Sequence, residues 1–215
     1  SFLSFREFME TMRIPEGREI RYSAFANWLF RFPRHQRVDD AHRLYEEFRG
    51  VITGSVVDKP FLSREEYLNL GVRQSIYLDN ERELVYTLFE KYLVFLKDNG
   101  FYDPNILAHN YLKDISRVYD FVVVDEVQDI TNIQLQTILG SLNNPDNFML
   151  CGDSNQIVHP NFFSCSSLKS MLYTSASLES RKVMRILQSN FRNSRAVIDL
   201  SNRLLRIKQK RFGSI

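Results

Sequence analysis

The sequence of 215 residues lacks several features that define particular classes of protein. Its two cysteines, Cys151 and Cys165, are too few for a disulfide scaffold and are typical of a reducing compartment. The sequence does not exclude a single disulfide bond between them. Its longest apolar runs, such as residues 121–124, are far shorter than the roughly 20 residues that a transmembrane helix needs. The amphipathic, acidic start is unlike a targeting peptide. We therefore expect an intracellular protein without a membrane segment, cytoplasmic in a bacterium or nuclear in a eukaryote.

The sequence also lacks a phosphate-binding loop, because none of its eight glycines is followed by lysine. Its formal net charge of +2 is too small to indicate a polyanionic partner by itself. Apolar residues are plentiful: 44% of the chain is hydrophobic and 25% is charged, as in globular proteins. A chain of this length can form one large or two small compact units.

The first half of the chain is predicted to be mainly helical. Ser63 and Glu66 have the Ser-x-x-Glu spacing of a capping box, and Asp103 and Pro104 suit the N-cap and the first residue of another helix. Apolar residues recur at helical spacing in residues 2–12, 23–32, 38–53 and 80–100, and a short strand is predicted at residues 18–22.

The second half has the alternating pattern of βαβ units. Strands are predicted at residues 120–125, 147–151 and 183–187, and helices at residues 131–142, 166–173 and 194–209. The expected fold class is therefore α/β, a parallel sheet with flanking helices, preceded by a mainly helical region.

Acidic residues follow two successive predicted strands. Asp125 and Glu126 end the first strand, and Asp153 follows the second. Because the carboxyl ends of parallel strands meet at one edge of a sheet, these side chains should lie close together. A carboxylate there can hold magnesium, its neighbour can orient a water, and the amide of Gln156 can contact a phosphate oxygen. For an arbitrary Asp-Glu pair, solubilising a strand end is the commoner role, but the repetition at a second strand favours a site.

Three segments carry a resemblance to a known family. VVVDEVQD (residues 122–129), GDSNQ (residues 152–156) and LQSNFRNS (residues 187–194) resemble the ordered motifs of UvrD/Rep-type superfamily 1 DNA helicases. Residues 20–30 and 102–112 are similar to two further segments of that family, although Ser23 replaces the usual histidine. The resemblance implies a RecA-like lobe of the P-loop NTPase type, with ATP and Mg²⁺ as cofactors and single-stranded DNA as a partner.

The resemblance also implies roles for single residues. Asp125 would coordinate magnesium, and Glu126 would be the catalytic base that positions water. Gln156 would contact the γ-phosphate, and Arg192 would be an arginine finger that neutralises charge on the transferring phosphoryl group. The residues implied in cofactor binding, and in coupling the nucleotide to the rest of the motor, are Gln128, Asp129 and Asp153.

Contacts with DNA bases are less well defined by the sequence. His159 stands where the family has a tyrosine that stacks on bases, and Phe162 or its neighbour offers a ring instead. A plain loop histidine and core phenylalanines explain these residues equally well. Ser23 and Phe25 lie in a segment that contacts nucleic acid in the family. The basic end at residues 203–212 is better explained as a solvated helix terminus than as a phosphate-binding surface.

In the family, the phosphate-binding loop precedes these motifs, so we expect this chain to be an inactive internal part of an ATP-dependent helicase. One alternative is a degenerate helicase-like module that binds DNA or protein without ATPase activity. Another is a metal-dependent nuclease that uses Asp125, Glu126 and Asp153. The expected organisation is residues 1–32 in the first RecA-like lobe, 33–115 as a helical insertion, 116–188 in the same lobe, and 189–215 at the start of a second lobe.

Overall fold

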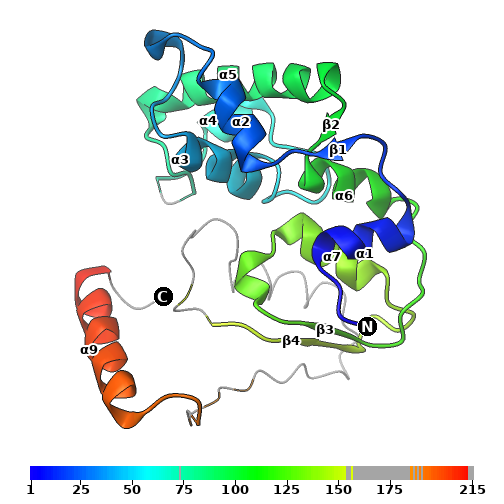
Figure 1. Cartoon of the computed structure of the whole chain (residues 1–215), viewed down its shortest axis with the longest axis vertical. Helices are drawn as coiled ribbons and strands as arrows, with labels where there is room; N and C mark the ends of the chain where they lie inside the picture. The colour runs from blue at the N-terminus through cyan, green and yellow to red at the C-terminus, as the bar shows by residue number, and fades with distance from the viewer. Residues whose placement is uncertain are drawn as a thin grey trace.

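The computed structural model describes residues 1–72, 74–153, 156, 185, 187, 189 and 191–212. These residues form a mixed α/β structure with two short parallel sheets (Figure 1). The strands are β1 (Arg18–Glu19), β2 (Phe101–Tyr102), β3 (Val122–Val124) and β4 (Phe148–Leu150). The α-helices are α1 (Phe5–Met12), α2 (Tyr22–Leu29), α3 (Ala41–Glu46), α4 (Arg64–Leu68), α5 (Asp79–Asp98), α6 (Pro104–Leu112), α7 (Asn132–Gly140) and α9 (Arg195–Phe212). Three further helical turns are η1 (Arg34–Gln36), η2 (Glu47–Ile52) and η3 (Val127–Asp129), of which η2 is a π-helix.

Local hydrogen bonds fix where several helices begin. The capping box predicted at Ser63 and Glu66 is present at the start of α4, so that prediction is confirmed. Asp103 caps α6 by accepting from two backbone N–H groups, with Pro104 as the first helical residue, as the sequence predicted. Capping boxes that we did not predict also open α1 (Ser4 with Glu7) and α7 (Thr131 with Gln134).

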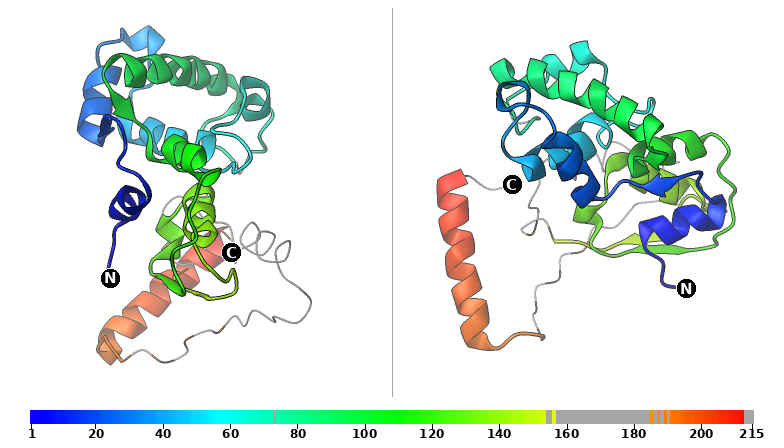
Figure 2. Two further views of the ribbon diagram at one scale, coloured as in Figure 1. Left: turned by 90° about the vertical axis from the view of Figure 1, so that its right-hand side faces the viewer. Right: turned by 45° about the horizontal axis from the view of Figure 1, so that its top comes forward.

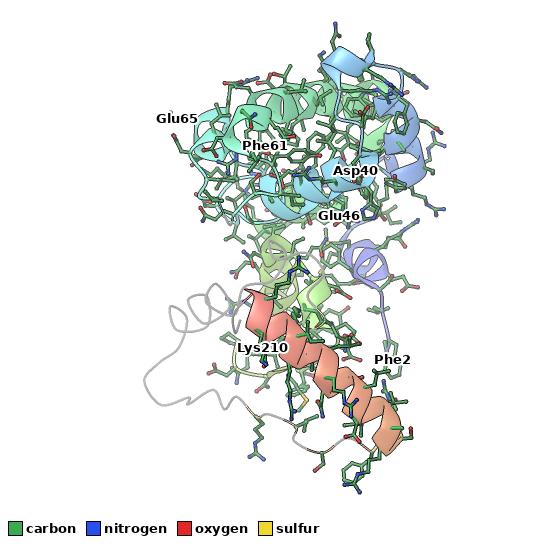
Figure 3. All side chains as sticks on the ribbon, turned by 90° about the vertical axis from the view of Figure 1, so that its left-hand side faces the viewer. Phe2, Asp40, Glu46, Phe61, Glu65 and Lys210 are labelled. Carbon is green, nitrogen blue, oxygen red and sulfur yellow. The ribbon has the colours of Figure 1, made fainter. Side chains whose placement is uncertain are left out.

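The helical region has a core of its own, formed by α2, α3, η2, α4 and α5 in the upper part of Figure 1. Aromatic rings dominate it: Phe25 packs against Trp28, Phe48 and Tyr92 with ring centroids 5.5 to 5.6 Å apart. The same region buries the carboxylate of Glu47, whose pKa is raised by burial against the opposing effect of its hydrogen bonds. Figure 3 shows the density of side chains between these helices.

A second core lies around β3 and β4, in the lower part of Figure 1. Val124 and Val127 pack there with Ala108 of α6 and with apolar residues of α1 and α7. The two strands are parallel, with Val122 opposite Phe148 and Val124 opposite Leu150. This sheet carries the acidic residues at its carboxyl edge.

The two cores group the chain in a way that bears on the predicted domains. Residues from Ile20 to Leu29 contribute to the helical core, whereas α1 and α6 pack with β3, β4 and α7. The boundaries predicted near residues 32 and 115 therefore do not coincide with the change from one core to the other. The assignment of these parts to two RecA-like lobes stays a prediction.

Helix α9 is amphipathic and most of its surface is exposed to solvent. It lies apart from both cores in Figure 1 and in the right-hand view of Figure 2. The helix predicted at residues 166–173 lies outside the described residues, as does most of the strand predicted at residues 183–187. Among the described residues, no helix has the length and apolar character needed to span a membrane.

Candidate functional site

The ends of β3 and β4 bring the predicted acidic residues to one edge of the sheet. The strands are hydrogen-bonded neighbours that run in the same direction. Their pairing continues past the last strand residues: the N–H of Cys151 donates to the carbonyl of Val124 over 2.8 Å, and the N–H of Val127 donates to the carbonyl of Cys151 over 2.9 Å. Asp125 and Glu126 therefore leave the sheet beside the segment that carries Asp153. The predicted adjacency of the two strand ends is confirmed.

The chain turns sharply at Glu126, which has a left-handed backbone conformation with φ 49° and ψ 44°. It is the one non-glycine residue with positive φ among the residues that the structure describes. Such a conformation is unfavourable for a residue with a β-carbon, and it is typical of functional loops. The turn is held by a hydrogen bond from the Glu126 N–H to Asp125 Oδ1 over 3.0 Å, and by one from the Asp129 N–H to the Glu126 carbonyl over 2.9 Å.

The side chain of Gln128 joins the two strand ends. It is 4% exposed, and its Oε1 accepts a hydrogen bond from the N–H of Asp153 over 3.1 Å. Its Nε2 donates to Glu126 Oε2 over 2.5 Å. Because one amide contacts both ends, the orientation of the Glu126 carboxylate depends on the position of the segment after β4.

Gly152 makes this arrangement possible, and the sequence analysis did not identify its role. A β-carbon at this position would lie 2.6 Å from Gln128 Oε1 and 2.8 Å from Val127 Cγ1. Both distances are shorter than β-carbon contacts in proteins. The signal in the sequence was the glycine directly before Asp153, which indicates a close approach of the backbone to another group.

Gln156 is tied to Asp153 rather than to Glu126. Its Nε2 donates to Asp153 Oδ2 over 3.1 Å, and its N–H donates to the Asp153 carbonyl over 3.1 Å. Gln156 is exposed, as are Asp125, Glu126 and Asp129. These polar groups are therefore accessible from solvent at one edge of β3 and β4.

A cleft of about 390 Å³ lies beside the acidic residues. Its lining includes Asp125, Glu126 and Asp129 as well as Arg6 and Arg49. The cleft thus combines acidic residues with two arginines, of which Arg6 donates through its Nε to Glu10 Oε1 over 2.9 Å.

The acidic residues suit one kind of metal site and not another. Among the described residues, no group of three or more His, Cys, Asp or Glu side chains is placed to hold a metal ion. Magnesium in phosphoryl-transfer sites needs fewer protein ligands, because it keeps several waters and binds one or two carboxylates together with the phosphates. The exposed carboxylates of Asp125 and Glu126 fit that description, whereas the three-carboxylate nuclease alternative gains no support from the described part of the chain.

The remaining predicted site residues are not brought to this edge by the described contacts. Phe25 is fully buried in the aromatic core, where its ring faces other rings instead of solvent, so base stacking by Phe25 gains no support. Ser23 is exposed on α2, and Arg192 is exposed three residues before the start of α9. His159 and Phe162 lie outside the described residues.

Comparison with known proteins gives a family match and a distant similarity to a much longer protein. Residues 57–162 match the family model of the UvrD/REP helicase N-terminal domain, and the matched segment includes both strand ends. The chain is 24% identical over 188 residues to the human TPR and ankyrin repeat-containing protein 1, a similarity that covers 79% of this chain and 6% of that protein. The chain thus spans a small fraction of the length of this relative. No solved structure matches the chain.

Proposed function

Because residues 57–162 are of the UvrD/REP helicase type, we propose that the whole protein couples ATP hydrolysis to movement along single-stranded DNA. The observation that carries the proposal is the convergence of Asp125, Glu126 and the Asp153 segment at the carboxyl edge of β3 and β4. Ligands of open α/β sheets bind at this edge.

Each residue at the edge has a proposed part in that reaction. Asp125 would hold magnesium, which would supply charge neutralisation on the phosphates. Glu126 accepts a proton from the attacking water and orients that water toward the γ-phosphorus. Gln156 contacts the γ-phosphate through its amide. In the proposed reaction Arg192 supplies a cation that stabilises charge on the transferring group.

For the buried amide of Gln128 we propose a role other than the cofactor contact that the resemblance implied. Its oxygen and nitrogen are both used within the protein, by the Asp153 N–H and by the Glu126 carboxylate. In the proposed mechanism it therefore holds Glu126 in place, and Asp129 and Asp153 connect this edge to the nucleotide. A base fixed in this way does not need to reorganise when the reaction starts.

Substitution of Glu126 by Gln in the whole protein tests the proposal. The substitution keeps the shape of the side chain and removes its ability to accept a proton, so DNA-stimulated ATP hydrolysis should fall by about 10²- to 10⁴-fold. Nucleotide affinity should change little, because the substitution leaves the phosphate contacts in place. The matched control is Glu65→Gln, at an exposed position in the first turn of α4.

Two outcomes would contradict the proposal. Equal turnover by Glu126→Gln and by the unsubstituted protein would remove Glu126 from its role as the base. A whole protein that shifts single-stranded DNA in a gel but hydrolyses no ATP would instead favour a degenerate module that binds DNA without catalysis.

A further inference from the structure

Asn105, near the start of α6, is fully buried and uses its side-chain amide for four hydrogen bonds. Its Nδ2 donates to the carbonyl of Arg49 over 2.8 Å and to Thr53 Oγ1 over 3.0 Å. Its Oδ1 accepts from Thr131 Oγ1 and from Gln134 Nε2, both over 2.9 Å. The two donors and the two acceptor positions of an asparagine amide are therefore all in use.

The donor side of Asn105 depends on the π-helix η2. In an α-helix the Thr53 N–H would donate to the carbonyl of Arg49, four residues earlier. Here it donates to the carbonyl of Phe48, five residues earlier, over 2.9 Å. The carbonyl of Arg49 is thereby left for Asn105. π-Helical turns are rare in proteins, and those that occur are often found at functional sites.

The acceptor side of Asn105 holds the segment that follows the acidic turn. Thr131 comes two residues after Asp129, and with Gln134 it forms the capping box that begins α7. Close contacts beside the amide strengthen this junction. A β-carbon at Gly54 would lie 2.8 Å from Thr131 Cγ2, and Asn132 Nδ2 donates to the carbonyl of Ser55 over 3.1 Å.

We propose that Asn105 is a positioning residue that couples the π-helix of the helical region to the acidic turn at residues 125–129. The π-helical register presents the Arg49 carbonyl to Asn105, and Asn105 in turn fixes Thr131, where the acidic turn ends. If η2 changed to the α-helical register, the Thr53 N–H would donate to the Arg49 carbonyl. The hydrogen bond from Asn105 Nδ2 to that carbonyl would then be lost. Binding events in the helical region would then reach Glu126 through this amide.

The functional meaning of this coupling rests on the proposed function, because it assumes that the position of Glu126 matters for hydrolysis. The coupling itself can be measured without nucleotide. Failure of the coupling therefore shows in the spectra described below, whereas failure of the proposed function shows in the turnover of Glu126→Gln.

The test uses NMR spectra of the chain with ¹⁵N-labelled backbone amides. Thr53→Val removes the hydroxyl that accepts from Asn105 and keeps the shape of the side chain, whereas Thr53→Ser keeps the hydroxyl. Asn105→Asp replaces the amide donors by an oxygen opposite the Arg49 carbonyl. The control is Tyr86→Phe, which removes a buried hydrogen bond of 2.8 Å to the carbonyl of Leu62 and touches neither Asn105 nor its four partners.

The expected result is a shift of the Glu126 and Asp129 amide signals, with at least tenfold faster hydrogen exchange of the Asp129 amide, in Thr53→Val and in Asn105→Asp. Thr53→Ser should restore the original spectrum, and Tyr86→Phe should leave these signals in place. Unchanged signals in Thr53→Val would overturn the proposal. Equal shifts in Tyr86→Phe would also overturn it, because they would show a general loss of stability. If Asn105→Asp does not fold, the Thr53 pair decides.

Discussion

Asn105→Ala should be among the most destabilising single substitutions in this chain. It removes the four buried hydrogen bonds of the amide and leaves the hydroxyl of Thr131 and the Nε2 of Gln134 without this acceptor. The carbonyl of Arg49 loses its side-chain donor as well. Each buried polar group that loses its partner costs about 1 to 3 kcal/mol. With three such groups, the expected loss is roughly 3 to 9 kcal/mol, a large part of the stability of an ordinary domain.

Urea unfolding followed by circular dichroism measures this loss. The matched control is Asn143→Ala, because Asn143 also donates a side-chain hydrogen bond over 2.9 Å, to Asp120 Oδ1, but at an exposed position. The control should lose about 0.5 kcal/mol or less, as surface substitutions usually do. A loss for Asn105→Ala no larger than that of the control would refute the reasoning, since the amide would then not be a satisfied, buried link between the two cores.

Three further predictions concern pH and packing. Hydrogen bonds from Lys59 and Ser63 lower the pKa of Glu66 from 4.5 to about 2. The contribution of ionised Glu66 to the stability of the folded state is therefore complete above pH 4.5 and is lost as the pH falls toward 2. Glu66→Gln should flatten the dependence of stability on pH in acid unfolding curves over that range. Burial raises the pKa of Glu47 above its ordinary 4.5, so the folded state binds a proton more tightly and stability falls as the pH rises from 4.5 toward the raised pKa. Glu47→Gln should remove that decline in urea unfolding measured from pH 4.5 to neutrality, and a persistent decline would assign it to other groups. Gly152→Ala should lower the midpoint of thermal unfolding through a loss of about 1 to 3 kcal/mol, because its β-carbon has no room beside β3; an unchanged midpoint would show that the site relaxes freely.

Local signals in the sequence predicted much of the secondary structure. The N-cap at Asp103 and the capping box at Ser63 depend on residues a few positions apart, and the structure has both. The long helix predicted at residues 80–100 is α5, whose apolar stripe includes Val85 and Phe89. Spacing along the chain is sufficient in these cases, because the interacting groups are close in sequence.

The candidate site could be predicted in part for a similar reason. Two apolar strands that end in acidic residues imply one edge of a parallel sheet, and β3 and β4 have that arrangement. The sequence did not show the left-handed backbone of Glu126 or the bridging amide of Gln128, because both depend on the approach of the segment after β4. A residue whose conformation is set by a distant segment carries no local pattern.

The packing of whole segments was the least accessible to sequence reasoning. Phe25 belongs to a segment similar to a DNA-contacting part of the family, yet its ring is central to the helical core. Asn105 carries no motif, and its role arises from the π-helical register of η2, which the apolar spacing around Phe48 and Ile52 does not distinguish from an α-helix. Long-range contacts of this kind become visible only in the folded chain.

The structure of the whole protein with magnesium and a non-hydrolysable ATP analogue tests the central claim most directly. The account predicts a metal ion that Asp125 binds directly or through water, with the γ-phosphate facing Glu126 and Gln156 at the carboxyl edge of β3 and β4. A nucleotide bound elsewhere, with this edge making no contact to metal or phosphate, would contradict it.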